Sequence, residues 1–226
     1  GKNIYIDDVT VSHECLLGCR ITEAYGGYIA SSQIGGETYY HVSTPEQLAH
    51  IGEHSDKNFI QTADIDLAGY NGGIWTPIGS DTLSDFTGKY DGGGCAIDSL
   101  DCSVGEATSI YAGLFSNLAG VNASISNLKI TLTGADISTD SGVHFGTVAG
   151  GMKGGTIKNC DVVIEGDVVQ GTKFYAGGIV GRAYELENGD TYAGLIENCS
   201  VTLSGGSIIN DNDGGSAGGI AGFCAN

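Results

Sequence analysis

Short alternations of apolar and polar residues dominate the second half of the chain. In the segment 125–132, Leu128, Ile130 and Leu132 are apolar, whereas Lys129 and Thr131 between them are polar. A period of two is typical of a β-strand that buries one face. The segment shows no helical periodicity, so we expect a strand here.

This strand pattern recurs along the chain, which indicates a repeat architecture. The copies, the first of them degenerate, occupy residues 97–102, 125–132, 157–164 and 196–203. A second motif, a glycine followed by small or apolar residues, lies between them at 113–116, 146–149, 178–181 and 219–222. Two interleaved motifs with matching offsets are much harder to obtain by chance than one.

Stacking the strand copies in register would bury a continuous face and satisfy the backbone hydrogen bonds between copies. The expected apolar columns are Leu100/Leu128/Cys160/Cys199, Cys102/Ile130/Val162/Val201 and Leu132/Ile164/Leu203. A polar column, Ser99/Asn127/Asn159/Asn198, precedes the strands. Asparagine tolerates bends and can hydrogen-bond its copy above and below. The pattern therefore predicts a parallel β-solenoid.

The first half of the chain carries different signals. Thr44, Pro45 and Gln47 form a capping box with proline at the first helical position. The apolar residues that follow predict a short helix reaching about His54, and strand-like residues occupy 59–67. We expect this helix and these strands to cap the solenoid.

Composition agrees with a folded solenoid. Glycine supplies 39 of the 226 residues without recurring at every third position, and proline occurs only twice, which excludes collagen. The 41% of apolar residues argues against disorder. In a coil, glycines turn corners and admit close backbone approach.

The charge balance excludes two partner classes. Lysine and arginine total 9 against 27 acidic residues, so the net charge is −18. Nucleic acid and anionic membrane surfaces both require clustered cations, which leaves cations and polar glycans as ligands. No apolar run approaches the roughly 20 residues of a membrane-spanning helix. The chain begins at Gly1, as it would after removal of an export signal or as a trimmed fragment, and it stops within a repeat motif, so we interpret it as a piece of a longer protein.

Several ordered motifs together resemble the bacterial GLUG-motif repeat family. The lead-in consists of residues 44–48, 64–67, 75–79 and 86–94, and the repeats are the glycine motifs and the Ile-x-Asn-Cys copies. The resemblance covers roughly residues 37–226, although the glycine motifs at 113 and 146 end in Ser116 and Ala149 instead of glycine. Such modules occur in exported bacterial surface proteins, including proteins assigned to adhesion, and in accessory regions of immunoglobulin A-cleaving metalloproteases.

The resemblance implies an all-β, right-handed parallel β-helix of about four coils, capped by the short helix and its strands. We expect residues 1–36 to be an N-terminal segment that ends a preceding module, 37–94 to be the cap, and 95–226 to hold the repeats. The motif is a scaffold signature. It therefore implies no catalytic residue, no cofactor-binding residue and no metal ligand.

One string matches a metalloenzyme motif. His50, Glu53 and His54 form His-x-x-Glu-His, which an inverted zinc protease places on a helix. Such chemistry needs a third ligand from another helix. Gly52 weakens the short helix, and no second long helix exists. We therefore do not expect zinc catalysis.

Acidic pairs leave calcium as the one cofactor still open. Asp64 and Asp66 lie on one side of a predicted strand, and residues 211–214, Asp-Asn-Asp-Gly, resemble the start of a calcium loop. No acid follows Asp213 at the required distance. Solvated or turn-forming carboxylates are the simpler interpretation.

Seven cysteines contain no Cys-x-x-Cys pair, so the common zinc patterns find no support. Cys15 and Cys19 could bridge locally. Parallel side chains in register disfavour a disulfide between Cys160 and Cys199. We expect these two, with Cys95 and Cys102, to be buried free thiols.

We expect a non-catalytic module of a secreted or cell-surface bacterial protein, acting in adhesion or as a spacer. It would be a monomeric part of a longer chain that contacts a host or cell-surface protein or glycan. Binding would use outward faces with tyrosines at 111, 175, 184 and 192. One alternative is a carbohydrate-active β-helix, either a polysaccharide lyase or hydrolase or a glycan binder, with Asp64, Asp66, Asp85, Asp91 and Lys89 converging. Another is an accessory domain of a larger surface protease.

Overall fold

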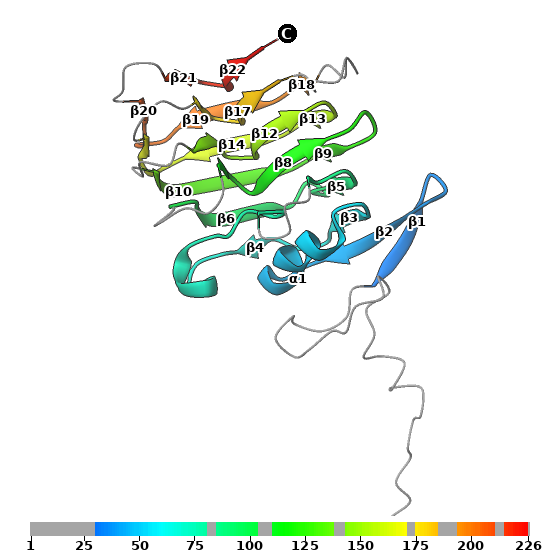
Figure 1. Ribbon diagram of the computed structural model, residues 1–226. Coiled ribbons are helices and arrows are strands. Elements are labelled where there is room, and N and C mark those ends of the chain that lie inside the picture. Colours follow the sequence, from blue (N-terminus) through cyan, green and yellow to red (C-terminus); the bar gives the residue numbers. More distant parts are fainter. Residues whose placement is uncertain are drawn as a thin grey trace, which may run out of the picture.

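The fold consists of short strands stacked in layers (Figure 1). The computed structural model describes residues 30–80, 85–103, 110–137, 143–170, 175–184, 194–210 and 215–225. Within these residues the chain is all-β apart from one α-helix and two 3₁₀ turns. No helix in the described part is long and apolar enough to cross a membrane.

The helix α1 (Pro45–His50) lies at the N-terminal end of the stack (Figure 1). The Thr44 hydroxyl accepts a hydrogen bond from Gln47 N, and Gln47 Oε1 accepts one from Ser43 N. This pairing confirms the capping signal, with the backbone of Ser43 as the second partner. The α-helix is shorter than predicted, because the chain tightens into the 3₁₀ turn η4 (Ile51–His54) around Gly52.

The strand predicted over 59–67 is two strands, β3 (Asn58–Gln61) and β4 (Ile65–Asp66). They belong to different sheets, because the chain turns a corner between them. The Asp64 carboxylate holds this corner by accepting a hydrogen bond from Ala96 N at 2.8 Å. A second 3₁₀ turn, η5 (Tyr70–Gly73), follows β4.

The first sheet runs along the whole stack. Its strands, in spatial order, are β1 (Ser31–Ile34), β2 (Glu37–Val42), β3, β5 (Lys89–Asp91), β9 (Ser124–Ser126), β13 (Thr156–Lys158) and β18 (Leu195–Glu197). Only β1 and β2 pair antiparallel, and every later pair is parallel. The hairpin of β1 and β2 therefore ends the sheet beside α1.

The strands of the second sheet also pair in parallel. Its longest strand, β10, pairs with further strands at its C-terminal end. Its strands are β4, β6 (Ala96–Asp101), β10 (Lys129–Ile137), β14 (Asp161–Ile164) and β19 (Ser200–Leu203), with β15 (Val168–Gln170) beside the end of β10 and β20 (Ile208–Asn210) beside β15.

Two further sheets complete each layer, and both are parallel throughout. The third contains β7 (Tyr111–Ala112), β11 (His144–Gly146), β16 (Tyr175–Gly177) and β21 (Ser216–Gly218). The fourth contains β8 (Phe115–Ala119), β12 (Ala149–Lys153), β17 (Val180–Ala183) and β22 (Ala221–Cys224). Successive layers thus begin at β5, β9, β13 and β18, and their parallel pairing fits a β-helix.

The register confirms the predicted column Leu132/Ile164/Leu203 and corrects the first residue of the other two. Val162 pairs with Ile130 and Val201, and Ile164 pairs with Leu132 and Leu203. The degenerate copy at 97–102 was misaligned. Its Ile97 pairs with Ile130 and its Leu100 with Leu132, so Leu100 and Cys102 do not align with Leu128 and Ile130. The residue that pairs with Ile125 is Tyr90, because the glycine-rich corner after β5 lengthens this layer.

The glycine motif needed a one-residue correction as well. Gly146 pairs with Gly177, and Gly177 pairs with Gly218. The copies that begin at Gly178 and Gly219 are therefore shifted by one residue relative to the copy at Gly146.

The predicted asparagine column forms at one corner of the stack. Asn127, Asn159 and Asn198 have φ of 56°, 53° and 51°, a left-handed conformation that asparagine tolerates. Asn159 Nδ2 donates to Asn127 Oδ1 at 2.9 Å, and Asn198 Nδ2 donates to Asn159 Oδ1 at 3.4 Å. At the lower end, Asn127 Nδ2 donates to the Asp91 carboxylate at 2.9 Å. Ser99 also has a positive φ but lies at a β-bulge of β6, outside this column.

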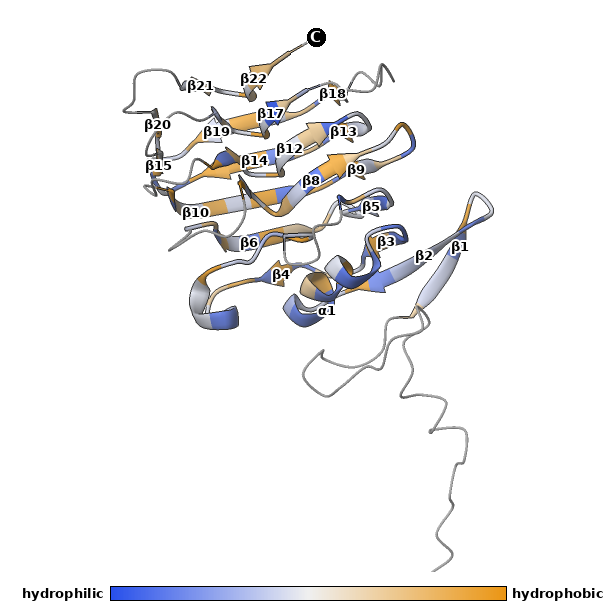
Figure 2. Ribbon diagram, viewed as in Figure 1, coloured by the Kyte–Doolittle hydropathy of each residue, from blue (hydrophilic) through white to orange (hydrophobic). Residues whose placement is uncertain are grey.

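The interior between the sheets is apolar and closely filled. Fully buried side chains include Phe59, Phe86, Tyr90, Phe115 and Phe145. Apolar segments recur in the strands of every layer, up to β22 (Figure 2). At the other end, Leu48 and Ile51 are fully buried under α1 and η4. The last layer instead exposes Leu195, Leu203, Ile209 and Ile220.

Candidate functional site

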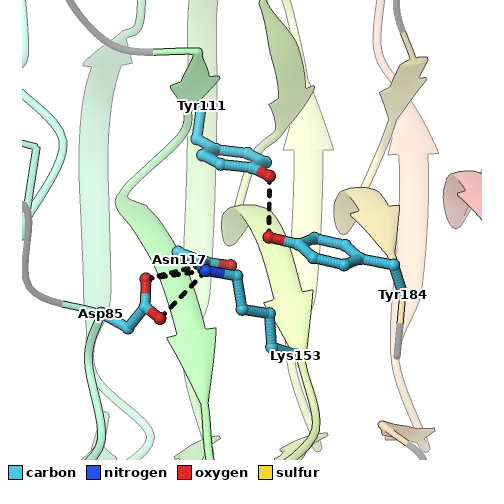
Figure 3. Close-up of polar contacts among 5 residues, drawn as sticks. All are labelled: Asp85, Tyr111, Asn117, Lys153 and Tyr184. Carbon is cyan, nitrogen blue, oxygen red and sulfur yellow. Dashed lines mark hydrogen bonds and ion pairs between the residues drawn. The ribbon is translucent and has the colours of Figure 1, made fainter. Parts of the chain in front are cut away.

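One face of the stack brings together polar and aromatic side chains from successive layers (Figure 3). We call this set the Tyr184 cluster. Its members are Asp85, Tyr111, Asn117, Lys153, Arg182 and Tyr184. Parallel pairing explains the convergence, because Asn117 on β8 and Arg182 on β17 both pair with Gly151 on β12.

Asp85 is the polar centre of the cluster. Its carboxylate lies 3.1 Å from Lys153 Nζ and accepts a hydrogen bond of 2.6 Å from Asn117 Nδ2. The Lys153 and Asp85 side chains keep 22% and 33% of their surface exposed, so the ion pair lies at the molecular surface. It therefore offers a donor and an acceptor side by side.

Tyr184 is the aromatic centre. The Arg182 guanidinium carbon lies 4.6 Å from the centre of its ring, and Lys153 Nζ lies 5.7 Å away, both within cation–π range. The Tyr184 hydroxyl lies 2.8 Å from the Tyr111 hydroxyl. Burial raises the pKa of both tyrosines, so both phenols stay protonated at neutral pH.

Gly151 makes room for this arrangement. A Cβ at this position would lie 2.5 Å from Asn117 Oδ1 and 2.8 Å from a Tyr111 ring carbon, both well inside van der Waals contact. Asn117 is only 2% exposed, and its Oδ1 has no hydrogen-bond partner among the described residues. Arg182 Nε is likewise buried and has no hydrogen-bond partner among the described residues. Both atoms are shielded from solvent, so they lie in the interior of the cluster and do not line its surface.

A column of neighbouring rings runs beside the cluster. Tyr111 and His144 have ring centres 5.5 Å apart, His144 and Tyr175 5.1 Å, and Tyr175 and Phe223 4.3 Å. Burial, together with the positive charge of Arg182, lowers the pKa of His144 to about 4. A neutral imidazole therefore lies between the tyrosines, tilted by 41° against Tyr111 and stacked on Tyr175.

The predicted tyrosine surface is thus divided between two roles. Tyr111 and Tyr175 are half-buried in the ring column, whereas Tyr184 combines its ring with charged groups. Tyr192 lies outside the described residues. Asn117 and Lys153 were not among the predicted site residues, and the sequence pattern did not connect Arg182 with either. Correct alignment of the glycine motifs would have placed Asn117, Gly151 and Arg182 in one column.

A second cluster forms at the N-terminal end. His50, Glu53 and His54 offer ligand atoms that all lie within 4.8 Å of one another. His50 Nδ1 is 3.5 Å from Glu53 Oε1, and the two imidazole centres are 5.2 Å apart. Burial and the neighbouring His50 lower the pKa of His54. The structure therefore places the side chains of the His-x-x-Glu-His motif next to one another, although α1 ends at His50.

The acids and the lysine proposed for a catalytic groove have separate structural partners. Asp64 holds a corner, and Asp66 accepts a hydrogen bond from Ala68 N, which lowers the pKa of its carboxyl group. Asp91 accepts hydrogen bonds from Gly93 N and Asn127, and Lys89 pairs with Glu37 at 2.6 Å. Asp85 alone belongs to the Tyr184 cluster. The loop 211–214 lies outside the described residues.

The described cysteines are free thiols. Cys102 and Cys160 are buried as expected, whereas Cys95 and Cys199 are partly exposed. Contact between the thiols of Cys160 and Cys199 raises the pKa of Cys160 and lowers that of Cys199. Cys15 and Cys19 lie outside the described residues.

Comparisons with known proteins leave the family open. No model of a protein family matches the chain, and no curated protein matches it. A solved structure from Bacteroides ovatus, named a "putative immunoglobulin A1 protease", is similar to it with 18% sequence identity and a TM-score of 0.47. The match covers 82% of this chain and 74% of that chain. The resemblance to GLUG-motif repeats stays a prediction.

Proposed function

We propose that this chain is a non-catalytic, right-handed β-helix module of an exported bacterial surface protein, and that it binds a glycan at the Tyr184 cluster. Parallel pairing between layers supports the scaffold role, because each layer extends the same faces without changing their shape. Adhesion through a glycan is favoured over a pure spacer by the chemistry gathered on one of these faces.

The carrying observation is the surface ion pair of Lys153 and Asp85 beside the Tyr184 ring. A sugar hydroxyl both donates and accepts hydrogen bonds, so neighbouring ammonium and carboxylate groups suit it. An aromatic ring offers an apolar edge or face to the C–H groups of a sugar ring.

The protonated state of the two tyrosines in the cluster favours glycan binding over a lyase reaction. A lyase needs a base that removes a carbon-bound proton. Burial raises the pKa of Tyr111 and Tyr184, which disfavours the phenolate form that such a base would need. Asp85 is held by Lys153 and Asn117. We therefore expect bound polysaccharide to remain intact during incubation, as chromatography of the recovered polysaccharide would show.

The test is a glycan array followed by calorimetry on the best ligand. We expect the wild-type chain to bind, and Tyr184→Ala and Asp85→Asn each to weaken binding at least about tenfold, or 1.4 kcal/mol. The matched control is Tyr39→Ala, since Tyr39 is also a half-buried tyrosine near an ion pair of lysine and a carboxylate, Lys89 with Glu37. This control should bind like wild type.

Absence of wild-type binding to any glycan on the array would reject the adhesion role and favour the spacer. Equal loss in Tyr39→Ala and Tyr184→Ala would place the binding face elsewhere. Circular dichroism of each variant distinguishes loss of binding from loss of fold.

A further inference from the structure

The cluster of His50, Glu53 and His54 has the donor atoms and spacing of a metal site. We propose that these three side chains bind one divalent transition-metal ion, with Zn²⁺ as the representative, and that the ion clamps the capped end of the stack. This inference is independent of glycan binding, because the two clusters share no residue.

The local backbone explains why these groups meet despite Gly52. The α-helix stops at His50, and the next four residues form a 3₁₀ turn. Gly52 therefore lies in a tight turn instead of weakening a helix interior. His50 and His54 remain neighbours across this junction, with ring centres 5.2 Å apart.

The distances suit a tetrahedral ion. Zinc binds histidine nitrogen and carboxylate oxygen at about 2.0–2.2 Å, so two ligand atoms of one tetrahedron lie about 3.4 Å apart. His50 Nδ1 and Glu53 Oε1 are 3.5 Å apart, already close to this spacing. The ligand atoms of all three residues lie within 4.8 Å of one another. A side-chain adjustment of His54 would complete the three-ligand set.

Donor chemistry selects the ion. Two imidazoles and one carboxylate suit Zn²⁺, Co²⁺ or Ni²⁺, whereas Ca²⁺ takes oxygen ligands only. The His50 side chain is 1% exposed and Glu53 is 50% exposed, so the site joins the core to the surface. Glu53 also lines a cavity of about 380 Å³ with Ala49, Tyr70, Trp75 and Pro77. Water from this cavity can supply a fourth ligand.

The three ligands come from the end of α1 and from η4, which cover one end of the apolar interior. An ion that binds only the folded chain stabilises it in proportion to the logarithm of its concentration over Kd. The proposed role is therefore structural. A catalytic zinc with the same three ligands would also need a general base beside the bound water, and Glu53 cannot be that base while it binds the ion.

The experiment measures zinc binding and thermal unfolding of metal-free protein. At zinc concentrations about 100 times Kd, we expect Tm to rise by roughly 5–10 °C, and calorimetry to give one ion per chain. His54→Ala and Glu53→Gln should each lose most of this rise. The control His41→Ala, which removes a histidine bonded to Ser32 on the outer hairpin, should retain it. Calcium should leave Tm unchanged.

Cobalt spectroscopy separates this site from the thiols. Co²⁺ on nitrogen and oxygen donors gives visible bands without sulfur-to-cobalt charge transfer, whereas the exposed Cys224 or the partly exposed Cys199 would produce such charge transfer. A wild-type chain without a zinc-dependent Tm rise would overturn the proposal. So would an equal rise in His54→Ala, or a cobalt spectrum dominated by sulfur charge transfer.

Discussion

At the residue scale, one corner of the stack depends on asparagine for two separate reasons. Asn127, Asn159 and Asn198 adopt a left-handed backbone, which costs most residues with a Cβ about 1 kcal/mol or more. Their side chains also hydrogen-bond from layer to layer. The same residue therefore turns the chain and joins adjacent layers, which explains its recurrence in the sequence.

Substitution of Asn159 separates these two contributions. Asn159→Ala loses both, so we expect the free energy of unfolding to fall by about 1–2 kcal/mol. Asn159→Gly keeps the backbone conformation and loses only exposed hydrogen bonds, so it should cost less than about 1 kcal/mol. Urea titration monitored by circular dichroism measures both. Equal stability of the two variants would show that the left-handed backbone is not the reason for asparagine.

At the element scale, the third and fourth sheets approach each other where glycines replace side chains. A Cβ on Gly146 of β11 would lie 2.4 Å from Gly181 N and 2.5 Å from Val180 Cα, both on β17. These neighbours are backbone atoms, which cannot move aside as the end of a flexible side chain could. The abundance of glycine thus reflects contact between strands as well as the turning of corners.

Gly146→Ala should therefore destabilise the fold by at least about 2 kcal/mol, because it forces the two sheets apart. The matched control is Gly219→Ala, the first residue of another copy of the motif, where an added Cβ meets nothing within 4 Å. We expect this control to stay within about 0.5 kcal/mol of wild type. Thermal unfolding of both variants checks the contrast, and similar Tm values for the pair would contradict the close-approach argument.

Sequence periodicity predicted the repeated strands well where the copies share a corner of the same length. The columns through Ile130 and Leu132 followed from alternation and offset alone. The same periodicity misaligned Ile97 and Leu100. The corner after β5 is longer and β6 contains bulges, and the alternation of apolar and polar residues does not show either feature. The Tyr184 cluster was missed for the same reason, since its residues meet only when the layers are aligned correctly.

At the scale of the whole molecule, the two ends of the stack differ. The N-terminal end is covered by α1 and η4 and by the β1–β2 hairpin (Figure 1). Among the described strands, those of the layer from β18 to β22 pair on one side only, and this layer exposes Leu203 and Ile220. In a stack of repeats, stability is approximately the sum of each layer's own stability and its contacts with neighbouring layers. The last layer should therefore open first.

Hydrogen exchange followed by mass spectrometry tests this expectation with two related strands. Val162 of β14 is 1% exposed and pairs on both sides, whereas its counterpart Val201 of β19 pairs on one side and is only partly buried. We expect amides of β19 and β22 to exchange at least about tenfold faster than those of β14 and β12, because local opening of the last layer breaks contacts with one neighbour instead of two. Equal protection along the stack would mean that all layers open together, and slower exchange in β19 would contradict the additive description.

The substitution Asn159→Ala, followed by the same measurement, should speed exchange mainly in β14 and the layers next to it, since the contacts that it removes join only adjacent layers.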